Sequence, residues 1–312
     1  YNKEDDATLN VNIVLGDVSI NEIENNSQEF ITINTPGSYN SKVIGEPQLP
    51  QFNQLIEIPA EANCRIEVIG ENSTVINLNN YKDNLKVVPS QPSIPKTINN
   101  EIEFQFNEML YNQNKFTNTN LVEIKNLGKI REVEIGHVTV NPFQYNPKTN
   151  ELKIYTEIDF NIHFDNANIN LSKDNKNKFA SPYFEQIFNT SLINYESPYK
   201  IDSQVRQNDF INDNVTYLII ANSTFEGYLE EFIEWKSKKG YNVIVAYTNE
   251  IGSSASSIKA YIQEQYNNPG NNLSSPSFVL LVGDTQQIPA SYSSGGHVSD
   301  LDYCDFSNDG VP

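Results

Sequence analysis

Apolar residues recur at every second position along the first half of the chain. Leu9, Val11, Ile13 and Leu15 show this spacing, and a repeat of two residues indicates a strand with one buried face. Similar stretches predict further strands at 30–33, 54–58, 65–69, 73–78, 86–88, 101–106, 129–140, 152–155 and 159–164. Many short strands between Pro, Gly and Asn turns are typical of a β-sandwich or a barrel-like domain.

The alternation ends near residue 165. Residues 165–180 are rich in Asn, Lys and Asp, which predicts a solvated linker. Phe184, Ile187, Phe188 and Leu192 then have helical spacing, which predicts a helix over 183–193. Residues 196–213 are polar again and predict an exposed connector, the kind of segment where proteolysis concentrates.

From residue 215 the pattern becomes one of alternating strands and helices. Strands are predicted at 216–221, 242–247 and 278–282, and helices at 225–233 and 258–266. Ser223 and Glu226 have the spacing of a capping box before the first helix, and Gly240 follows its end. This order predicts a parallel sheet with right-handed crossovers. Chemistry in such sheets gathers at the carboxyl ends of the strands, and Asp284 lies two residues after the third strand.

Composition narrows the class of function. The 312 residues carry a net charge of −19, which argues against binding to nucleic acid, since that affinity depends largely on Lys and Arg. No apolar run reaches the roughly 18 residues of a membrane span. Cys64 and Cys304 lie in different predicted domains and are expected to be free thiols. This composition fits a soluble, exported protein or a calcium binder.

Oxygen ligands crowd the end of the chain. The side chains are Asp284, Asp300, Asp302, Asp305, Asn308 and Asp309, and the backbone carbonyl of Val311 can join them. Hard cations such as Ca²⁺ take several carboxylate and carbonyl oxygens, so these residues predict a calcium site. The alternative is a polar loop in an acidic protein. His297 and Cys304 suggest a Cys–His pair, but their spacing is unspecific and we assign neither to catalysis.

Several segments resemble the gingipain family. Those similar to the start of its catalytic domain are 217–221, 232–240, 258–262, 280–284 and 299–310. Those similar to its β-rich inhibitory prodomain are 45–50 (GEPQLP), 142–147 (PFQYNP) and 152–158. Gingipains are secreted bacterial cysteine endopeptidases with a caspase-like fold. The resemblance implies a β-rich prodomain with a C-terminal helix and linker at 1–200. It also implies, at 201–312, the N-terminal βαβαβ part of an α/β caspase-like three-layer domain, incomplete at its C-terminal end.

The resemblance also implies that the catalytic residues lie elsewhere. The family's catalytic His and Cys follow the segment that matches 308–310, so we expect them beyond Pro312 and expect this chain alone to be inactive. Its partner is then the remainder of the catalytic domain, in the same precursor or as a second chain, and its substrates are proteins or peptides. Asp284, Asp300 and Asp309 match acidic positions of the family, whereas Ser307 departs from one.

Basic residues are candidates for inhibition and processing. Lys96 falls on the loop position where gingipain-type prodomains place a basic side chain that blocks the specificity pocket, and Arg131 is a second loop candidate. A tethered loop inhibits well because its effective concentration is high. Lys200 lies in a stretch similar to the family's maturation boundary, with Arg206 as the competing cleavage site. These residues predict latency until cleavage near 200–206 and a preference for Lys over Arg. The alternative for Lys96 is a solvated surface lysine.

A second class of function stays open. The chain could be a non-catalytic extracellular binding or adhesion module, in which a β-sandwich is joined to an α/β domain. This alternative is favoured by the lack of a convincing nucleophile–base pair in the sequence.

Overall fold

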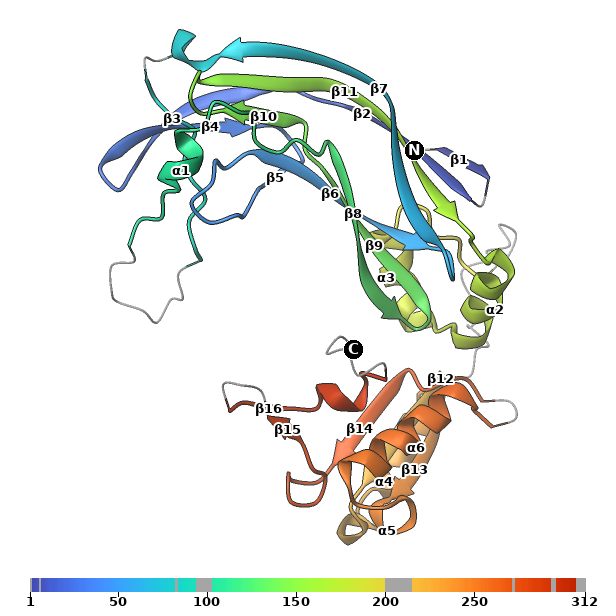
Figure 1. Cartoon of the computed structure of the whole chain (residues 1–312). Coiled ribbons are helices and arrows are strands. Elements are labelled where there is room, and N and C mark those ends of the chain that lie inside the picture. Colours follow the sequence, from blue (N-terminus) through green and yellow to red (C-terminus); the bar gives the residue numbers. More distant parts are fainter. Residues whose placement is uncertain are drawn as a thin grey trace. The chain divides into compact units, whose positions relative to one another are not determined.

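The chain folds into two compact units (Figure 1). The computed structural model describes residues 2–5, 7–81, 84–93, 103–199, 215–270, 273–292 and 296–306. The first unit contains Tyr1–Leu127 and Gly136–Ala167, and the second contains Gly128–Ile135 and Asn168–Pro312. The predicted domain boundary, between residues 200 and 201, lies outside the described residues.

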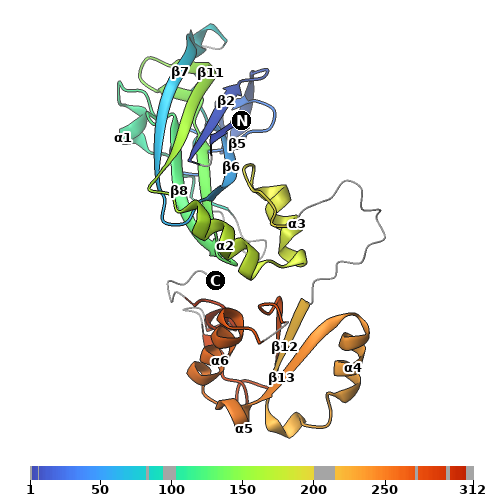
Figure 2. The ribbon, with the colours of Figure 1, turned by 90° about the vertical axis from the view of Figure 1, so that its right-hand side faces the viewer.

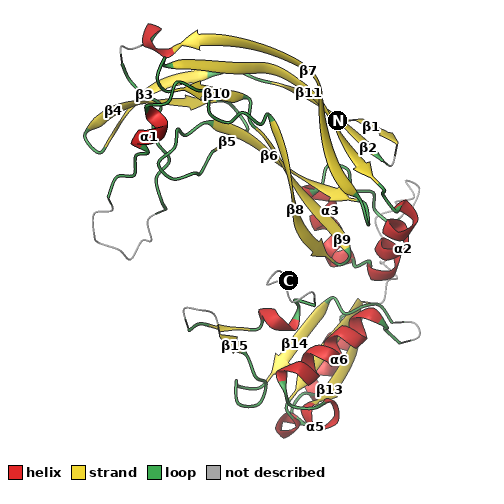
Figure 3. Cartoon of the chain, viewed as in Figure 1, coloured by secondary structure: helices red, strands yellow, loops and turns green. Residues whose placement is uncertain are grey.

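The first unit consists mainly of antiparallel strands, which confirms the prediction of a β-rich domain (Figure 3). One sheet has the order β1-β2-β11-β10 with β7 on the other side of β11, a second has the order β5-β6-β9-β8, and β3 and β4 form a hairpin. The elements are β1 (Asn2–Asp5), β2 (Thr8–Val14), β3 (Ser19–Asn25), β4 (Gln28–Asn34), β5 (Tyr39–Asn40), β6 (Pro50–Ile58), β7 (Asn63–Asn77), the 3-10 turn Leu78–Asn80, α1 (Glu108–Tyr111), β8 (Val122–Ile130), β9 (Val133–Val140), β10 (Phe143–Asn146) and β11 (Glu151–Asp165).

Strand β11 organises the larger sheet. It pairs with β7 along its whole length on one edge, and with β10 and then β2 on the other. Its buried apolar residues at even positions are Leu152, Ile154, Ile158, Phe160, Ile162 and Phe164. The sequence predicted two strands in this region, at 152–155 and 159–164, but the structure has one strand with register shifts against β7.

The turn before β11 holds a buried polar cluster centred on Asn150. The residue is 1% exposed and adopts a left-handed conformation, with φ of 57°. Its side chain accepts a hydrogen bond from the Tyr145 hydroxyl at 2.6 Å and donates to Asn79 Oδ1 at 2.6 Å and to the Leu85 carbonyl at 3.0 Å. Asparagine is one of the few residues that tolerate this backbone and can satisfy these partners.

Two predictions about connecting segments are wrong. The predicted strand at 129–140 is a hairpin, because Arg131 and Glu132 have φ values of 49° and 61° and reverse the chain between β8 and β9. The predicted linker at 165–180 contains helix α2 (Ile169–Phe179), whose first turn is capped by the side chain of Asn168. The helix was not predicted because the segment is mostly polar, although the helix buries Phe179.

Three further strand assignments differ from the structure. The predicted strand at 86–88 pairs only through an isolated bridge between Val87 and Ile31. The described residues 103–106 of the predicted strand at 101–106 form no strand, and strand β3 was not predicted. In each case tertiary contacts outweigh the local pattern.

The second unit has the predicted order of strands and helices. Its elements are α2, α3 (Pro182–Ser191), β12 (Val215–Ala221), the 3-10 turn Ser223–Phe225, α4 (Glu230–Lys238), β13 (Tyr241–Tyr247), α5 (Thr248–Ile251), α6 (Ala255–Asn267), β14 (Phe278–Val282), β15 (Ser291–Tyr292), β16 (Val298–Ser299) and the 3-10 turn Leu301–Tyr303. Strand β12 lies between β13 and β14, and both pairings are parallel.

Helices cover both faces of this parallel sheet (Figure 2). Leu218 and Ile220 of β12 belong to the same buried cluster as Ile258 and Ile262 of α6. Tyr217 points to the opposite face, where its ring meets Phe232 of α4 edge-on with 6.2 Å between centroids. The alternation of side chains along β12 therefore separates the two helix layers.

The predicted capping box at Ser223 and Glu226 is wrong. Asn222 caps a short 3-10 turn by accepting a hydrogen bond from the Thr224 amide at 3.0 Å, and α4 begins only at Glu230. Within the described residues, no helix is long and apolar enough to cross a membrane.

The Asn150 cluster yields a stability prediction. Asn150→Ala should lower the free energy of unfolding of the first unit by roughly 2–4 kcal/mol, because it leaves buried partners unsatisfied and strains the backbone. Asn150→Gly is the matched control, since glycine tolerates this φ and should recover about 1 kcal/mol. Urea unfolding followed by far-UV circular dichroism measures both variants. Wild-type stability of the alanine variant would contradict this assignment.

Candidate functional site

The carboxyl ends of the parallel strands carry a connected set of polar groups. Asn222 follows β12, Thr248 follows β13 and Asp284 lies two residues after the end of β14. The Asn222 amide group donates to Thr248 Oγ1 at 3.4 Å, and Gln287 donates to Thr224 Oγ1 at 3.3 Å. Ligands in open α/β sheets bind at this edge, so it is the site that the fold itself favours. The sequence analysis identified Asp284 but missed Asn222 and Thr248, each of which directly follows a strand.

Asp284 is held at this edge by a tight turn. Its carboxylate Oδ1 accepts a hydrogen bond from the Thr285 amide at 2.7 Å, and its carbonyl oxygen accepts from the amides of Gln287 and Ile288 at 2.7 and 2.8 Å. The side chain is exposed, so its second oxygen can face solvent or a ligand. Carboxylate, amide and hydroxyl groups can bind polar ligands, but they do not make a nucleophile–base pair.

Gly283 allows this turn to pack against the following segment. A Cβ atom at this position would lie 2.9 Å from Ile288 Cγ1 and 3.1 Å from Gln287 Cβ, and its φ is 152°. Ile288 itself is buried in the core cluster that includes Leu218 and Ile258. The close approach therefore fixes both the turn and the direction of the Asp284 side chain.

The predicted calcium ligands are only partly described. Asp300 is exposed at the start of the 3-10 turn Leu301–Tyr303, whereas Asp305 is buried and its amide donates to the Leu301 carbonyl at 3.2 Å. Burial, and next the charges of Asp300 and Asp302, raise the pKa of the Tyr303 hydroxyl, which donates to the Pro289 carbonyl.

Asn308, Asp309 and Val311 lie outside the described residues. Within the described part of the chain, no three His, Cys, Asp or Glu side chains are grouped closely enough to hold one metal ion. Asp284, Asp300 and Asp305 therefore do not form a complete calcium site by themselves, and calcium stays a prediction.

Cys304 is exposed directly after the 3-10 turn Leu301–Tyr303. Its sulfur donates to the Leu301 carbonyl at 3.1 Å, and desolvation raises the pKa of the thiol. A nucleophilic cysteine needs the opposite shift, toward the thiolate. His297 is exposed in the segment before β16. The thiol chemistry gives no support to a Cys304 nucleophile.

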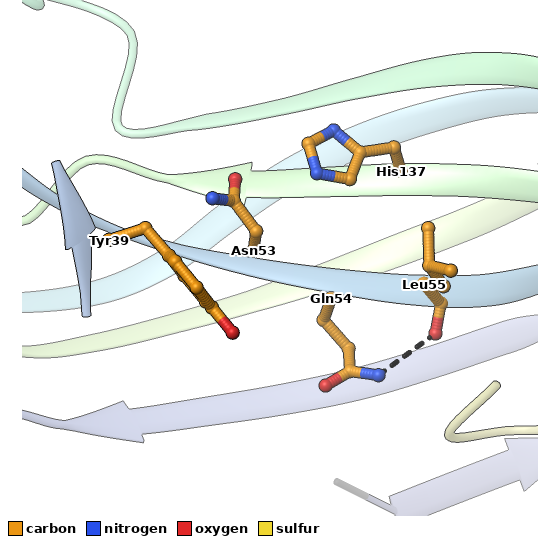
Figure 4. A pocket seen from close by; sticks show the side chains of 5 residues that line it. All are labelled: Tyr39, Asn53, Gln54, Leu55 and His137. Carbon is orange, nitrogen blue, oxygen red and sulfur yellow. Dashed lines mark hydrogen bonds between the residues drawn. The ribbon is translucent and has the colours of Figure 1, made fainter. Parts of the chain in front are cut away.

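A shallow hollow of about 290 Å³ lies on the first unit (Figure 4). It is lined by Tyr39, Asn53, Gln54, Leu55 and His137. Thr139 Oγ1 lies 3.4 Å from His137 Nδ1 and donates to Asn53 Oδ1 at 3.1 Å, so these polar side chains are engaged with the sheet. The lining contains no carboxylate or thiol, which is not the composition of a hydrolytic centre.

The basic candidates fall into two groups. Lys96, Lys200 and Arg206 lie outside the described residues. Arg131 is described, and its guanidinium contacts backbone carbonyls of the second unit. These contacts engage every side-chain nitrogen of Arg131, which is not the geometry of a free arginine awaiting a specificity pocket.

Comparison with known proteins gives the family. The model of the propeptide family Propeptide_C25 matches residues 4–202, and the model of Peptidase family C25 matches residues 211–312. The chain belongs to the gingipain family, peptidase family C25. It contains the gingipain prodomain and the N-terminal part of the catalytic domain.

Individual gingipains are similar over most of the chain. Lys-gingipain HG66 from Porphyromonas gingivalis is 30% identical over 289 residues, which are 92% of this chain and 16% of that protein. Gingipain R1 from the same species is 28% identical over 254 residues, or 80% of this chain and 24% of that protein. The chain thus spans about one sixth of Lys-gingipain HG66.

A solved gingipain complex shares the fold. The complex of Porphyromonas gingivalis RgpB pro- and mature domains superposes with a TM-score of 0.51 and 20% sequence identity, over 62% of this chain and 96% of that chain.

Gly283 is expected to be irreplaceable for packing. Gly283→Ala should destabilise the second unit by about 1–3 kcal/mol, because its Cβ would overpack the turn against Ile288. Trp235, the only tryptophan of the chain, lies in α4 and reports unfolding of this unit by fluorescence in urea.

Gly227→Ala is the control for this prediction. Gly227 also has a positive φ, of 83°, but a Cβ there would meet no atom within 4 Å. Gly227→Ala therefore measures the backbone cost alone. Equal losses of unfolding free energy in the Gly227→Ala and Gly283→Ala variants would show that close packing at Gly283 is unimportant.

Proposed function

We propose that the chain is the zymogen portion of a secreted, gingipain-like cysteine endopeptidase. Its prodomain keeps the peptidase latent until the chain is cut near residues 200–206. The observation that carries this proposal is the order of the two family matches, with a propeptide at 4–202 directly before a peptidase at 211–312. Arg206 lies in the short interval between the matches, and Lys200 lies just before it. The peptidase match favours this function over an adhesion module.

The catalytic pair is expected in the remainder of the catalytic domain, beyond Pro312. A thiolate there attacks the carbonyl carbon of a peptide bond, the histidine protonates the leaving amine, and water releases the acyl group. This chain contributes the first part of the α/β framework, which we expect to be completed as a caspase-like three-layer domain. Its polar edge at Asn222, Thr248 and Asp284 then lies where such a sheet places its chemistry.

Latency is assigned to a basic side chain of the prodomain. Lys96 is proposed to enter the specificity pocket as a substrate mimic, and its tether to the peptidase gives it a high effective concentration. The Lys-gingipain match covers more of the chain than the match to Gingipain R1, which supports a preference for Lys over Arg. The solved complex of RgpB pro- and mature domains supports binding between the prodomain and the peptidase in this family.

Calcium is proposed as a structural ion near the carboxyl edge of the sheet. Asp284, Asp300 and Asp305 would provide some of its ligands, and Asn308, Asp309 and the Val311 carbonyl the others. The described residues alone do not assemble the site, so the proposal depends on the chain after residue 306.

Latency is tested in the precursor that includes the remaining catalytic domain. In a background with Lys200→Ala and Arg206→Ala to prevent cutting, Lys96→Ala should raise hydrolysis of a Lys-nitroanilide peptide by about 10-fold or more, because the tethered blocker is lost. Lys115→Ala, at an exposed lysine of the first unit, is the control and should change nothing. Equal rates for the Lys96 and Lys115 variants would refute the assignment of Lys96.

Calcium binding is tested by thermal unfolding of the chain, followed by Trp235 fluorescence. Calcium at 1 mM should raise the midpoint of the second unit by about 2–8 °C relative to chelator, because a ligand that binds only the folded state stabilises it. Asp284→Asn should reduce this shift, whereas Asp17→Asn in the first unit should keep it. Identical midpoints of the wild-type chain in calcium and in chelator would exclude the site.

A further inference from the structure

The tip of the β8–β9 hairpin packs as part of the second unit, not of the first. Arg131 and Glu132 form this tip with φ values of 49° and 61°. Positive φ at both residues is the geometry of a two-residue hairpin turn, and Asn26 and Ser27 between β3 and β4 have similar values. The place of the tip in the second unit therefore depends on its side-chain contacts.

Arg131 binds three backbone carbonyls with its three side-chain nitrogens. Nε donates to the Phe179 carbonyl at 2.7 Å, Nη1 to the Pro276 carbonyl at 2.9 Å and Nη2 to the Ser275 carbonyl at 3.3 Å. The rings of Phe184 and Tyr266 lie 5.3 and 5.6 Å from the guanidinium carbon. A planar, delocalised guanidinium can make this fork of bonds while it stacks on aromatic rings, and a lysine ammonium cannot.

The carbonyl groups that accept hydrogen bonds from Arg131 lie in segments that are held by other contacts. Ser275 and Pro276 are buried, and Ser275 Oγ donates to the Tyr266 carbonyl at 2.6 Å. Ser277 N donates to the Thr216 carbonyl at 3.0 Å, which ties the same loop to β12. Phe179 ends α2, where unpaired carbonyls and the helix dipole favour a cation. Burial lowers the pKa of Arg131, and the carbonyl acceptors compensate the guanidinium for the water it loses.

Four further contacts join the same two parts of the chain. Phe179 stacks on Tyr266 with 4.9 Å between ring centroids, and the Ser181 and Ser277 hydroxyls lie 2.7 Å apart. Tyr183 meets Phe278 edge-on at 4.7 Å, and its hydroxyl bonds to that of Tyr241. In each contact the first residue lies in the propeptide match and the second in the peptidase match. The cluster is thus an interface between two parts of the precursor.

The interface lies at the amino ends of the parallel strands. Ser275, Pro276 and Ser277 immediately precede β14, and Tyr241 is the first residue of β13. Asp284 and the polar groups described above lie at the carboxyl ends of the same strands, and so at the opposite edge of the sheet. The propeptide residues of this interface therefore bind at the amino ends of the strands and do not cover the carboxyl ends, where Asp284 lies.

We propose that Arg131, with the aromatic and serine contacts around it, anchors the propeptide on the amino edge of the peptidase sheet. The partner recognised is the carbonyl-lined loop at 275–277 of the peptidase part. After the chain is cut near residues 200–206, this anchor keeps the two pieces together without a covalent link. The proposal rests on the proposed zymogen function, but it assigns binding and inhibition to different residues, Arg131 and Lys96.

The test uses the 312-residue chain with a site for a specific protease placed in residues 203–209. After complete cutting, the two pieces are separated by dilution, and their dissociation constant is measured with a fluorescent label on the propeptide piece. Arg131→Ala should weaken binding by about 30-fold or more, as expected for a central arginine that leaves buried acceptors unpaired. Arg131→Lys should also weaken it, by about 10-fold, because the fork of bonds is lost.

Lys129→Ala is the matched control from the same hairpin. Lys129 is half-exposed and pairs with Glu132 of the same hairpin at 3.5 Å, so its removal should change the dissociation constant by less than about twofold. A dissociation constant for Arg131→Ala within twofold of wild type would overturn the proposal.

A double-mutant cycle tests the interface even where Arg131→Ala does not fold. Ser181→Ala and Ser277→Ala should each raise the dissociation constant. The double variant should raise it by at least threefold less than the product of the two single factors, because both substitutions remove the same contact. Independent effects would contradict the interface. No peptidase activity enters this measurement, so a failure of Lys96-dependent latency and a failure of the anchor give different results.

Discussion

Arg131 sets the main constraint on the second unit, because a guanidinium can leave water only where acceptors replace it. Three carbonyls from two distant segments converge on it, the end of α2 and the loop before β14. Those carbonyls would themselves lack a strong donor without the arginine. The hairpin tip, α2 and the α/β sheet therefore depend on one another. Two segments of the propeptide match, 128–135 and 168–202, belong to the same unit as the peptidase match.

Most of the strands could be predicted because one face of each sheet is buried. The even positions of β11 carry the apolar side chains that its alternation indicated. The parallel direction of β12, β13 and β14 was also predictable, since their apolar runs alternate along the chain with segments of helical spacing. The hairpin at Arg131 was not, because positive φ in two charged residues leaves no signal in the sequence. Helix α2 was missed because its stability comes from a cap and from one buried phenylalanine.

The candidate site could be predicted only in outline. Asp284 was placed correctly after the end of a strand, because strand ends are visible in sequence, although β14 is a partly exposed edge strand with Val279 42% exposed. Its neighbours Asn222 and Thr248 meet only when the parallel sheet forms. Arg131 was considered as a blocker of a specificity pocket. Its guanidinium is instead engaged by carbonyls that no local pattern identifies, since backbone acceptors are common to all residues.

The central claim is that cleavage of the connector converts a latent precursor into a peptidase. The most direct measurement follows hydrolysis of Lys- and Arg-nitroanilide peptides by the full precursor, sampled together with N-terminal sequencing of the products. We expect negligible hydrolysis before cleavage, then activity that rises with a new N-terminus at residue 201 or 207 and favours Lys. Full activity of the uncut precursor, or activity that follows a cut elsewhere while residues 200–206 stay intact, would contradict it.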